Sequence, residues 1–239
     1  MIDLVIFIIG LGVFIGFFSQ TINGFSAAVF AVPIMLFVLT VQEAMAIMAV
    51  LLLVFSIVFV PKNWKHIDKK VVLGIAITNI IGFLIGSYVL IKVDSGILAK
   101  SLGVFILCYV AYSFIKNKKV ESFKKLGFMF GFLGGIFSAL FASGGPLIAT
   151  YVNNKLVHKD VIRATIIGIF AISNVIRIPI FAYNGLFTHQ VLLNSVYALP
   201  FFFLALYVGQ KLYNKLNDKW FGYVVMITLT IAAISLLIR

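Results

Sequence analysis

The chain has 239 residues, of which 63% are hydrophobic and 11% are charged, and its mean hydropathy is +1.16. A soluble domain is closer to half apolar with about 25% charged residues, so the composition excludes a soluble globular protein. The net charge of +12 does not indicate nucleic-acid binding, because nearly all lysines and arginines lie in short links between apolar runs. That distribution is typical of a protein that orients itself in a membrane.

Apolar segments follow one another along the chain, and several approach the ~20 residues that span a bilayer core. We expect an all-α integral membrane protein, multi-pass in the plasma or inner membrane, without a cleaved signal and with a single transmembrane domain over residues 1–239. The ten expected segments are Ile2–Phe18, Gly24–Leu39, Ala44–Val60, Val71–Ile91, Ile97–Ile115, Leu126–Ala142, Pro146–Val152, Val161–Tyr183, Val191–Leu212 and Trp220–Ile238.

The run from Gly131 to Tyr151, GFLGGIFSALFASGGPLIATY, is apolar but cannot form one regular helix. The sequence Ser-Gly-Gly-Pro at 143–146 breaks it, because glycine permits unusual dihedrals and proline has no N–H to donate. Backbone groups freed in this way are tolerated in hydrocarbon only where they face protein or a wet cavity. Broken helices of this kind indicate a transporter binding site.

An internal repeat relates the two halves of the chain. Gly16–Pro33 (GFFSQTINGFSAAVFAVP) resembles Gly134–Tyr151 (GGIFSALFASGGPLIATY) after a shift of 118 positions, from 16 to 134. The stretches IGSYVLIKV from Ile85 and VGQKLYNKL from Val208 extend the similarity. We expect two five-segment repeats, residues 1–115 and 126–239, joined by the basic linker 116–125.

Charge distinguishes two topologies. If each broken pair of segments returns to the side it came from, 15 basic residues lie in cytoplasmic links and three lie outside, with Arg177 inside a segment. If each pair makes a single crossing, ten basic residues lie inside and eight lie outside, which shows no bias. The positive-inside rule favours the first topology, in which the halves are inverted relative to each other. Whether the broken pairs cross fully or form re-entrant hairpins stays open.

The two breaks supply candidate solute-binding groups. A half-helix that begins near Ser26 or Pro146 points its positive N-terminus at whatever lies in front of it. Two such ends near the midplane would form an anion site without full charges, whereas the alternative is close packing of helices by small residues. The expected binding residues at the breaks are Gln20, Asn23, Gly24, Ser26, Ser143, Gly144, Gly145 and Pro146.

Arg177 lies inside an apolar segment, in the stretch SNVIRIPIF. A charged side chain within a membrane segment is costly and indicates function, and Asn174 lies one turn earlier on the same face. We include both residues in the expected substrate-binding set; the alternative is that Arg177 snorkels to the outer interface. The first half has no arginine at the equivalent position.

Neither an enzyme nor a metal centre is indicated. An intramembrane enzyme needs a convergent acid–base or metal set, and the acidic residues all fall in links or at segment ends. Thr40 and Glu43 fit a helix capping box, and His66, His158 and His189 lie in links without ligand spacing. We therefore expect no catalytic residues, no metal and no cofactor.

At the two glycine-bearing repeats the sequence resembles the sulfite exporter TauE/SafE family of membrane transporters. That family carries a small-residue GxGGG-like run followed by proline in each half. Here the first copy is GFSAA at 24–28 followed by Pro33, and the second is ASGGP at 142–146 with Tyr151 where the first copy has proline. The resemblance implies a duplicated all-helical transporter of small anions, often sulfur-containing ones such as sulfite, thiosulfate or sulfoacetate.

The sequence thus predicts a membrane transporter of a small, sulfur-containing anion. Its partners are the anionic solute and the lipid bilayer, and its mechanism is alternating access around a midplane site where the breaks Gly24–Ala28 and Ser143–Pro146 face each other. A non-transporting membrane scaffold predicts breaks that are packed dry against other helices. A small-anion channel differs from both by lacking alternating closure.

Overall fold

The computed structural model describes residues 2–24, 27–115, 127–142 and 144–213, together with positions 230, 233, 234 and 237. Within these residues the chain is helical and contains no strand. Nine of the ten expected segments are α-helices, and the tenth, Trp220–Ile238, lies outside the continuously described part, as does the linker 116–125. The helices are α1 (Ile2–Asn23), α2 (Ala27–Met35), α3 (Val41–Asn63), the 3-10 helix η1 (Trp64–His66), α4 (Lys69–Lys92), α5 (Ser95–Ile115), α6 (Gly127–Phe141), α7 (Gly145–Asn153), α8 (Lys159–Tyr183) and α9 (His189–Leu212).

Five helical stretches of the described chain are long and apolar enough to cross a membrane: Leu4–Ile22, Val41–His66, Lys69–Lys92, Lys159–Tyr183 and His189–Leu212. On α4 the exposed side chains include Leu73, Ile77, Leu84 and Tyr88. Their spacing places them along one side of the helix. Because a large apolar surface on the outside of a protein marks contact with a non-aqueous partner, this side of α4 suits contact with lipid.

Side-chain caps fix where several helices begin. The hydroxyl of Thr40 accepts from the backbone N–H of Glu43 at 3.3 Å, and the carboxylate of Glu43 accepts from the N–H of Thr40 at 2.8 Å. This confirms the predicted capping box at the start of α3. The side chains of Asp68 and Thr188 likewise accept from a backbone N–H group in the first turns of α4 and α9. Each cap satisfies an N–H group that the first turn of a helix leaves unpaired.

Both predicted helix breaks are present. The first separates α1 from α2 and the second separates α6 from α7. Gly24 and Ala142, the residues that follow α1 and α6, have positive φ values of 82° and 47°, a conformation that turns the chain out of a helix. The short helices α2 and α7 have nine residues each, or about 13 Å, which is less than half of the ~30 Å hydrocarbon core.

Around the two breaks, several helix bounds of the two halves keep a spacing of 118 positions along the chain, whereas the bounds of α4 and α9 are 120 positions apart (69 to 189 and 92 to 212). The bounds of α2 and α7 are 118 positions apart (27 to 145 and 35 to 153), as are the ends of α1 and α6 (23 to 141) and the starts of α3 and α8 (41 to 159). The two positive-φ residues have the same spacing (24 to 142). The local structure therefore recurs with the period found in the sequence.

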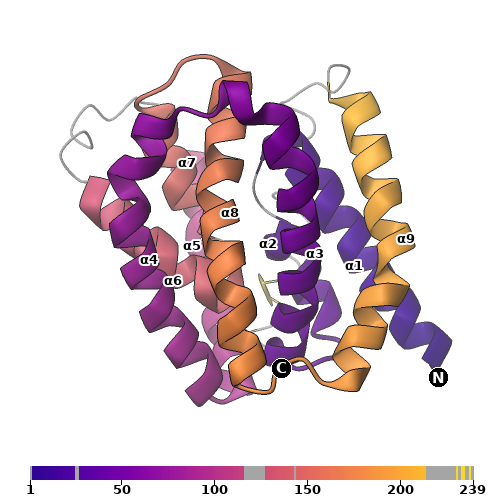
Figure 1. Ribbon diagram of the computed structural model, residues 1–239. Coiled ribbons are helices and arrows are strands. Elements are labelled where there is room, and N and C mark those ends of the chain that lie inside the picture. The colour runs from indigo at the N-terminus through magenta and orange to yellow at the C-terminus, as the bar shows by residue number, and fades with distance from the viewer. Residues whose placement is uncertain are drawn as a thin grey trace.

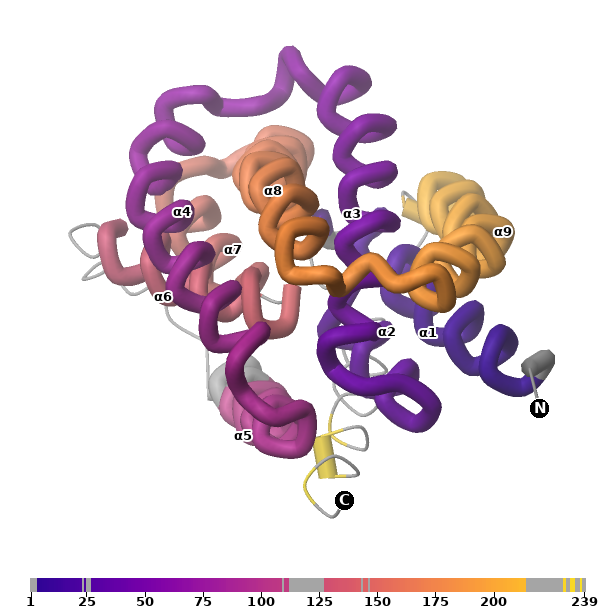
Figure 2. Tube along the Cα trace, turned by 60° about the horizontal axis from the view of Figure 1, so that its bottom comes forward, coloured from indigo at the N-terminus to yellow at the C-terminus, as the bar shows by residue number. Residues whose placement is uncertain are grey.

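Helices α3 and α8 form the centre of the molecule (Figure 1). In that view α3 rises toward the link that carries η1, whereas α8 descends toward the link to α9, so the two helices run in opposite directions. Figure 2 shows α4, α6 and α7 on the side of α8, and α1, α2 and α9 on the side of α3. The most extensive contacts, α4 with α6 and α1 with α9, each join a helix of one half to a helix of the other. The halves are thus interlocked around α3 and α8.

Aromatic side chains hold the α3 side of this arrangement together. The ring of Phe17 on α1 lies between Phe55 on α3 and Phe202 on α9, with centroid distances of 5.9 and 4.7 Å. All three side chains are fully buried. Aromatic pairs at such distances contribute about 0.5–1.5 kcal/mol beyond their buried area, so this contact fixes α1 and α9 against the central helix.

Candidate functional site

A polar cavity lies between α3 and α8, half-way along both helices. Leu52 and Phe170 each stand eleven residues after the start of their helix (41 to 52 and 159 to 170), about 16 Å into a core of ~30 Å. Leu52 and Phe170 therefore lie near the middle of two helices that are long enough to cross a membrane. The cavity is lined by Gln20, Leu52, Ser138, Ala142, Phe170, Asn174 and Arg177.

Four of the seven lining residues form two pairs with the spacing of the repeat. Gln20 and Ser138 are 118 positions apart and both face the cavity, and so are Leu52 and Phe170. Each pair brings one residue from each half. The cavity is thus built where equivalent positions of the two halves meet.

Asn174 belongs to a third pair of this kind, with Ser56. Its side-chain amide donates to the hydroxyl of Ser56 at 3.0 Å and to the backbone carbonyl of Leu52 at 3.3 Å. Asn174 and Ser56 are both buried. These bonds tie α8 to α3 beside the cavity and fix the direction of the amide.

Arg177 brings a full charge to the cavity. Its side chain is 1% exposed, so it ends inside the protein and does not snorkel to the interface. Nη2 donates to the backbone carbonyl of Ser138, and the guanidinium carbon lies 5.1 Å from the ring centroid of Phe83. Among the residues that the structure describes, its Nε and Nη1 have no hydrogen-bond partner, and neither has the buried hydroxyl of Ser138.

Unpaired groups of this kind are expensive to bury. A charged group that leaves water without a partner costs several kcal/mol, and native proteins hydrogen-bond the large majority of their buried polar atoms. The described residues that line the cavity include no acid that could pair with Arg177. A guanidinium fork, a hydroxyl and side-chain amides are instead the groups that bind an oxyanion.

The cavity is closed to such a solute in this conformation. Its empty volume is about 270 Å³, including the gaps between the lining atoms, and it leaves room for about one water molecule. An anion of several atoms can enter only if the helices around the cavity move apart.

The structure places three of the residues predicted from sequence, Gln20, Asn174 and Arg177, in the lining of the cavity. Gln20 also closes the first break, because its side-chain oxygen accepts from the backbone N–H of Ala27 at 3.1 Å. This N–H at the start of α2 is therefore satisfied within the protein. It does not point freely at a solute, as the sequence analysis had assumed for both half-helices.

The glycines of the breaks serve close packing. A Cβ atom at Gly144 would lie 2.0 Å from the carbonyl oxygen of Gly134 and 2.2 Å from the hydroxyl of Ser138. A Cβ atom at Gly24 would lie 2.9 Å from Cγ of Arg163. Neither glycine lines the cavity. Close packing of helices, the alternative explanation for small residues at the breaks, therefore accounts for these two glycines.

The remaining predicted residues sit at helix ends. Asn23 is the last residue of α1, and Gly145 and Pro146 open α7. Ser26 and Ser143, and the side chains of Asn23 and Pro146, lie outside the part that the structure describes.

Both breaks adjoin the cavity. Ala142 at the second break lines it, and so does Gln20, whose side-chain oxygen accepts from the N–H of Ala27 at the first break. Gly24 packs against Arg163 near the start of α8, so the first break also reaches toward that end of the helix. That the two breaks face each other at one level stays a prediction.

Sequence reasoning did not include Ser138, Leu52, Phe170 or Ala142 in the binding set. The signal for Ser138 was available, since it stands 118 positions from Gln20 in the repeat. For Leu52 and Phe170 no signal distinguishes them from other apolar residues of α3 and α8. Only the crossing of these two helices brings them to the cavity.

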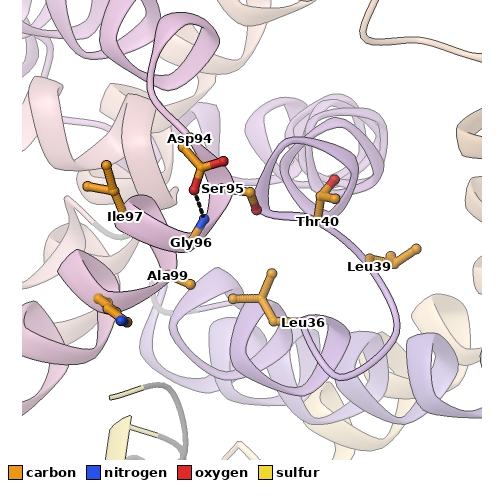
Figure 3. A pocket seen from close by; sticks show the side chains of 9 residues that line it. Leu36, Leu39, Thr40, Asp94, Ser95, Gly96, Ile97 and Ala99 are labelled. Carbon is orange, nitrogen blue, oxygen red and sulfur yellow. Dashed lines mark hydrogen bonds between the residues drawn. The ribbon is translucent and has the colours of Figure 1, made fainter. Parts of the chain in front are cut away.

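A second pocket, with an empty volume of about 880 Å³, lies beside the links that precede α3 and α5 (Figure 3). Three of its polar side chains, those of Asp94, Ser95 and Thr40, are already engaged. A carboxylate oxygen of Asp94 accepts from the N–H of Gly96 at 2.7 Å, and the hydroxyl of Ser95 accepts from the N–H of Val41 at 2.8 Å. Thr40 forms its capping box. These groups hold the helix starts in place, and this pocket carries no argument for solute binding.

Long apolar helices around a buried cation in a polar cavity define a multi-pass membrane protein of the transport class. The chain belongs to the sulfite exporter TauE/SafE family, whose sequence profile matches residues 8–236. It is similar to the probable sulfite/organosulfonate exporter TauE of Cupriavidus necator, with 25% identity over 204 residues, which cover 82% of this chain and 79% of the relative. No solved structure matches the chain. The resemblance seen at the glycine-bearing repeats is confirmed.

Proposed function

We propose that this protein moves small sulfur-containing oxyanions, such as sulfite, thiosulfate or sulfoacetate, across the cell membrane. The observation that carries this proposal is the buried guanidinium of Arg177, whose Nε and Nη1, like the hydroxyl of Ser138 beside them, have no hydrogen-bond partner in the described part of the chain. A guanidinium binds an oxyanion through two parallel N–H bonds. The relative from Cupriavidus necator is named for the export of sulfite and organosulfonates, which supports the same class of solute.

The proposed mechanism is alternating access by two inverted repeats, residues 1–115 and 126–239. The spacing of 118 between helix bounds around the breaks and between the positive-φ residues supports a duplication. The opposite directions of α3 and α8 in Figure 1 support inversion. Inverted repeats with broken helices, and a site where the repeats meet, are a common plan of secondary transporters. The closed cavity favours this mechanism over a permanently open channel.

The proposed orientation puts the start of α8 in the cytoplasm. Figure 1 places the link between α3 and α4 at the same end of the molecule as the start of α8. Both regions are basic, with Lys62, Lys65 and Lys69 in the first and Lys155 and Lys159 in the second. The positive-inside rule assigns such links to the cytoplasm. Arg177 then lies in the outer half of the membrane.

A membrane scaffold that moves nothing is the second candidate. The small cavity and the tight contacts at Gly24 and Gly144 favour it, since dry packing of small residues holds membrane helices together. The two candidates differ in the role of Arg177. A scaffold needs its bond to Ser138 for stability, whereas a transporter keeps its unpaired nitrogens for a solute.

Purified protein in lipid vesicles tests the proposed function. Vesicles preloaded with unlabelled sulfite or thiosulfate should accumulate the radiolabelled anion faster than empty ones, because a transporter exchanges solute across one shared site. The matched control is Arg177→Met, which removes the guanidinium and keeps much of the side-chain volume. Uptake that equals that of protein-free vesicles for all three anions would reject the proposal.

A further inference from the structure

The geometry points to a second anion-binding station at Arg163, next to the first helix break, from which the solute passes along one face of α8 to the cavity at Arg177. This inference rests on the proposed function and extends it to a residue that the cavity does not include. It concerns the same class of solute, a small oxyanion.

Arg163 is held between the first break and two aromatic rings. Its stem packs on Gly24, where a Cβ atom would lie 2.9 Å from Cγ of the arginine. Its guanidinium carbon lies 4.5 Å from the ring centroid of Tyr213 and 5.6 Å from that of Phe59. The hydroxyl of Tyr213 donates to the carboxylate of Asp160 at 3.0 Å. Burial and this bond raise the pKa of Tyr213 above its ordinary value, so the phenol stays protonated.

Arg163 shares an unusual feature with Arg177. Its Nε is buried and has no hydrogen-bond partner, as is true of Nε and Nη1 of Arg177. Among the described residues only two further buried side-chain atoms lack partners, the hydroxyls of Ser87 and Ser138. The buried donors without partners are therefore concentrated on the two arginines of α8.

Each helix break has one of these arginines beside it. Arg177 donates to the carbonyl of Ser138, one turn before the second break, and Arg163 lies on Gly24 at the first. The repeat places Phe59 at the position equivalent to Arg177 (59 to 177), and the guanidinium of Arg163 lies over the ring of Phe59. The first half has no arginine at the position equivalent to Arg177. Arg163, from the second half, thus supplies a cation at the first break.

The two arginines lie on one stripe of α8. Arg163, Phe170, Asn174 and Arg177 follow each other at spacings of seven, four and three, which keeps them on the same side of a helix. The last three line the cavity. Because the arginines are separated by about 21 Å of helix, one small anion contacts only one of them at a time. Arg163 receives the solute at the end where α8 begins, and Arg177 binds it in the cavity.

The test compares Arg163→Met, Arg163→Lys and Lys159→Met in vesicles. Methionine keeps the packing of the stem on Gly24 and removes the guanidinium. Lys159 is the matched control, since its Nζ lies 5.2 Å from the centroid of the same Tyr213 ring and it carries the same charge at the same end of α8. The measurements are KM and Vmax of radiolabelled sulfite uptake, together with the rise in melting temperature that sulfite causes in purified protein.

We expect Arg163→Met to raise KM at least fivefold and to keep the stabilisation by sulfite, which reports binding at Arg177. Arg163→Lys should recover part of the lost KM effect and keep a KM at least twofold above wild type, and Lys159→Met should stay within twofold of wild type. Wild-type kinetics in Arg163→Met, or an equal effect of Lys159→Met, would overturn the second station while leaving the proposed function intact. If Arg163→Met does not fold, a fully wild-type KM in Arg163→Lys would overturn it instead, because lysine lacks Nε and the planar fork. A wild-type protein that moves no anion would overturn both.

Discussion

The side-chain amide of Asn174 donates to the hydroxyl of Ser56 at 3.0 Å, and these two residues stand 118 positions apart in the chain. They occupy the same place in the two repeats, so the bond joins equivalent points of α3 and α8. Leu52 and Phe170, a further pair with this spacing, lie one turn away and line the cavity. Contact between equivalent residues is expected where two inverted repeats meet, so this pair supports the proposed inversion.

The first prediction concerns this bond. Ser56→Ala and Asn174→Ala should each lower stability, and the double variant should lose less than the sum of the two. Hydrogen bonds between membrane helices have coupling energies of about 0.6 kcal/mol and at most about 1.7 kcal/mol in double-mutant cycles. The measurement is the unfolding free energy in detergent. Strictly additive losses would show that the two side chains do not interact.

The second prediction separates a transporter from a scaffold. Arg177→Met should leave the melting temperature unchanged or raise it, because replacing a buried charge by an apolar side chain of similar volume is often neutral or stabilising. The carbonyl of Ser138 keeps its bond from the N–H of Ala142 at 2.9 Å, so the substitution leaves no orphaned acceptor there. Sulfite should no longer stabilise the variant, since a ligand raises stability only in proportion to its binding.

The control for this experiment is Arg177→Lys. Lysine keeps the charge but lacks the planar fork, so we expect weaker but measurable stabilisation by sulfite. Charge-assisted hydrogen bonds contribute about 1.5–3 kcal/mol each, or roughly 10- to 100-fold in affinity. A large fall in the melting temperature of Arg177→Met without any ligand would favour the scaffold.

The third prediction concerns Gly144. Gly144→Ala should destabilise the protein by about 1–3 kcal/mol, the usual cost of overpacking, because the new Cβ would overlap the carbonyl oxygen of Gly134 and the hydroxyl of Ser138. Gly74→Ala is the matched control, since its nearest neighbour would be the hydroxyl of Tyr151 at 3.2 Å. Alanine also favours a helix over glycine by about 1 kcal/mol. Equal melting temperatures for the two variants would contradict the packing at the second break.

The fourth prediction uses the positive φ values at the breaks. Gly24→Ala should cost at least about 1 kcal/mol, because an L-residue at φ 82° is strained and its Cβ would touch Arg163. Ala142→Gly should change stability by less than about 1 kcal/mol, since relief of the strain at φ 47° is offset by the greater backbone entropy of glycine. Thermal unfolding of both variants checks the asymmetry. A tolerated Gly24→Ala would show that the chain turns differently after α1.

Local chemistry explains why the breaks and several site residues were predictable. Ser-Gly-Gly-Pro before Leu147 disfavours a continuous helix, and an arginine among apolar residues identifies a costly position, whatever the tertiary structure. Gln20 and Asn174 could be predicted as site residues because each is a polar residue close in sequence to such a feature, Gln20 to the first break and Asn174 to Arg177. The capping box of Thr40 and Glu43 was also readable, because its partners are three residues apart.

The parts that sequence could not supply depend on tertiary contacts. Nothing near Gly24 in the sequence indicates that Arg163, 139 positions away (24 to 163), packs against it. The bond from Ala27 to Gln20 depends on the angle at which α2 leaves α1.

A structure with bound selenite tests the central claim most directly, because selenium replaces the sulfur of sulfite and its anomalous scattering locates it without a prior assumption. The account predicts a selenium peak between α3 and α8, with selenite oxygens at roughly 2.7–3.2 Å from Nε or Nη1 of Arg177. No peak at that place in protein that selenite stabilises, or a peak only in the pocket beside Asp94 and Lys100, would contradict it.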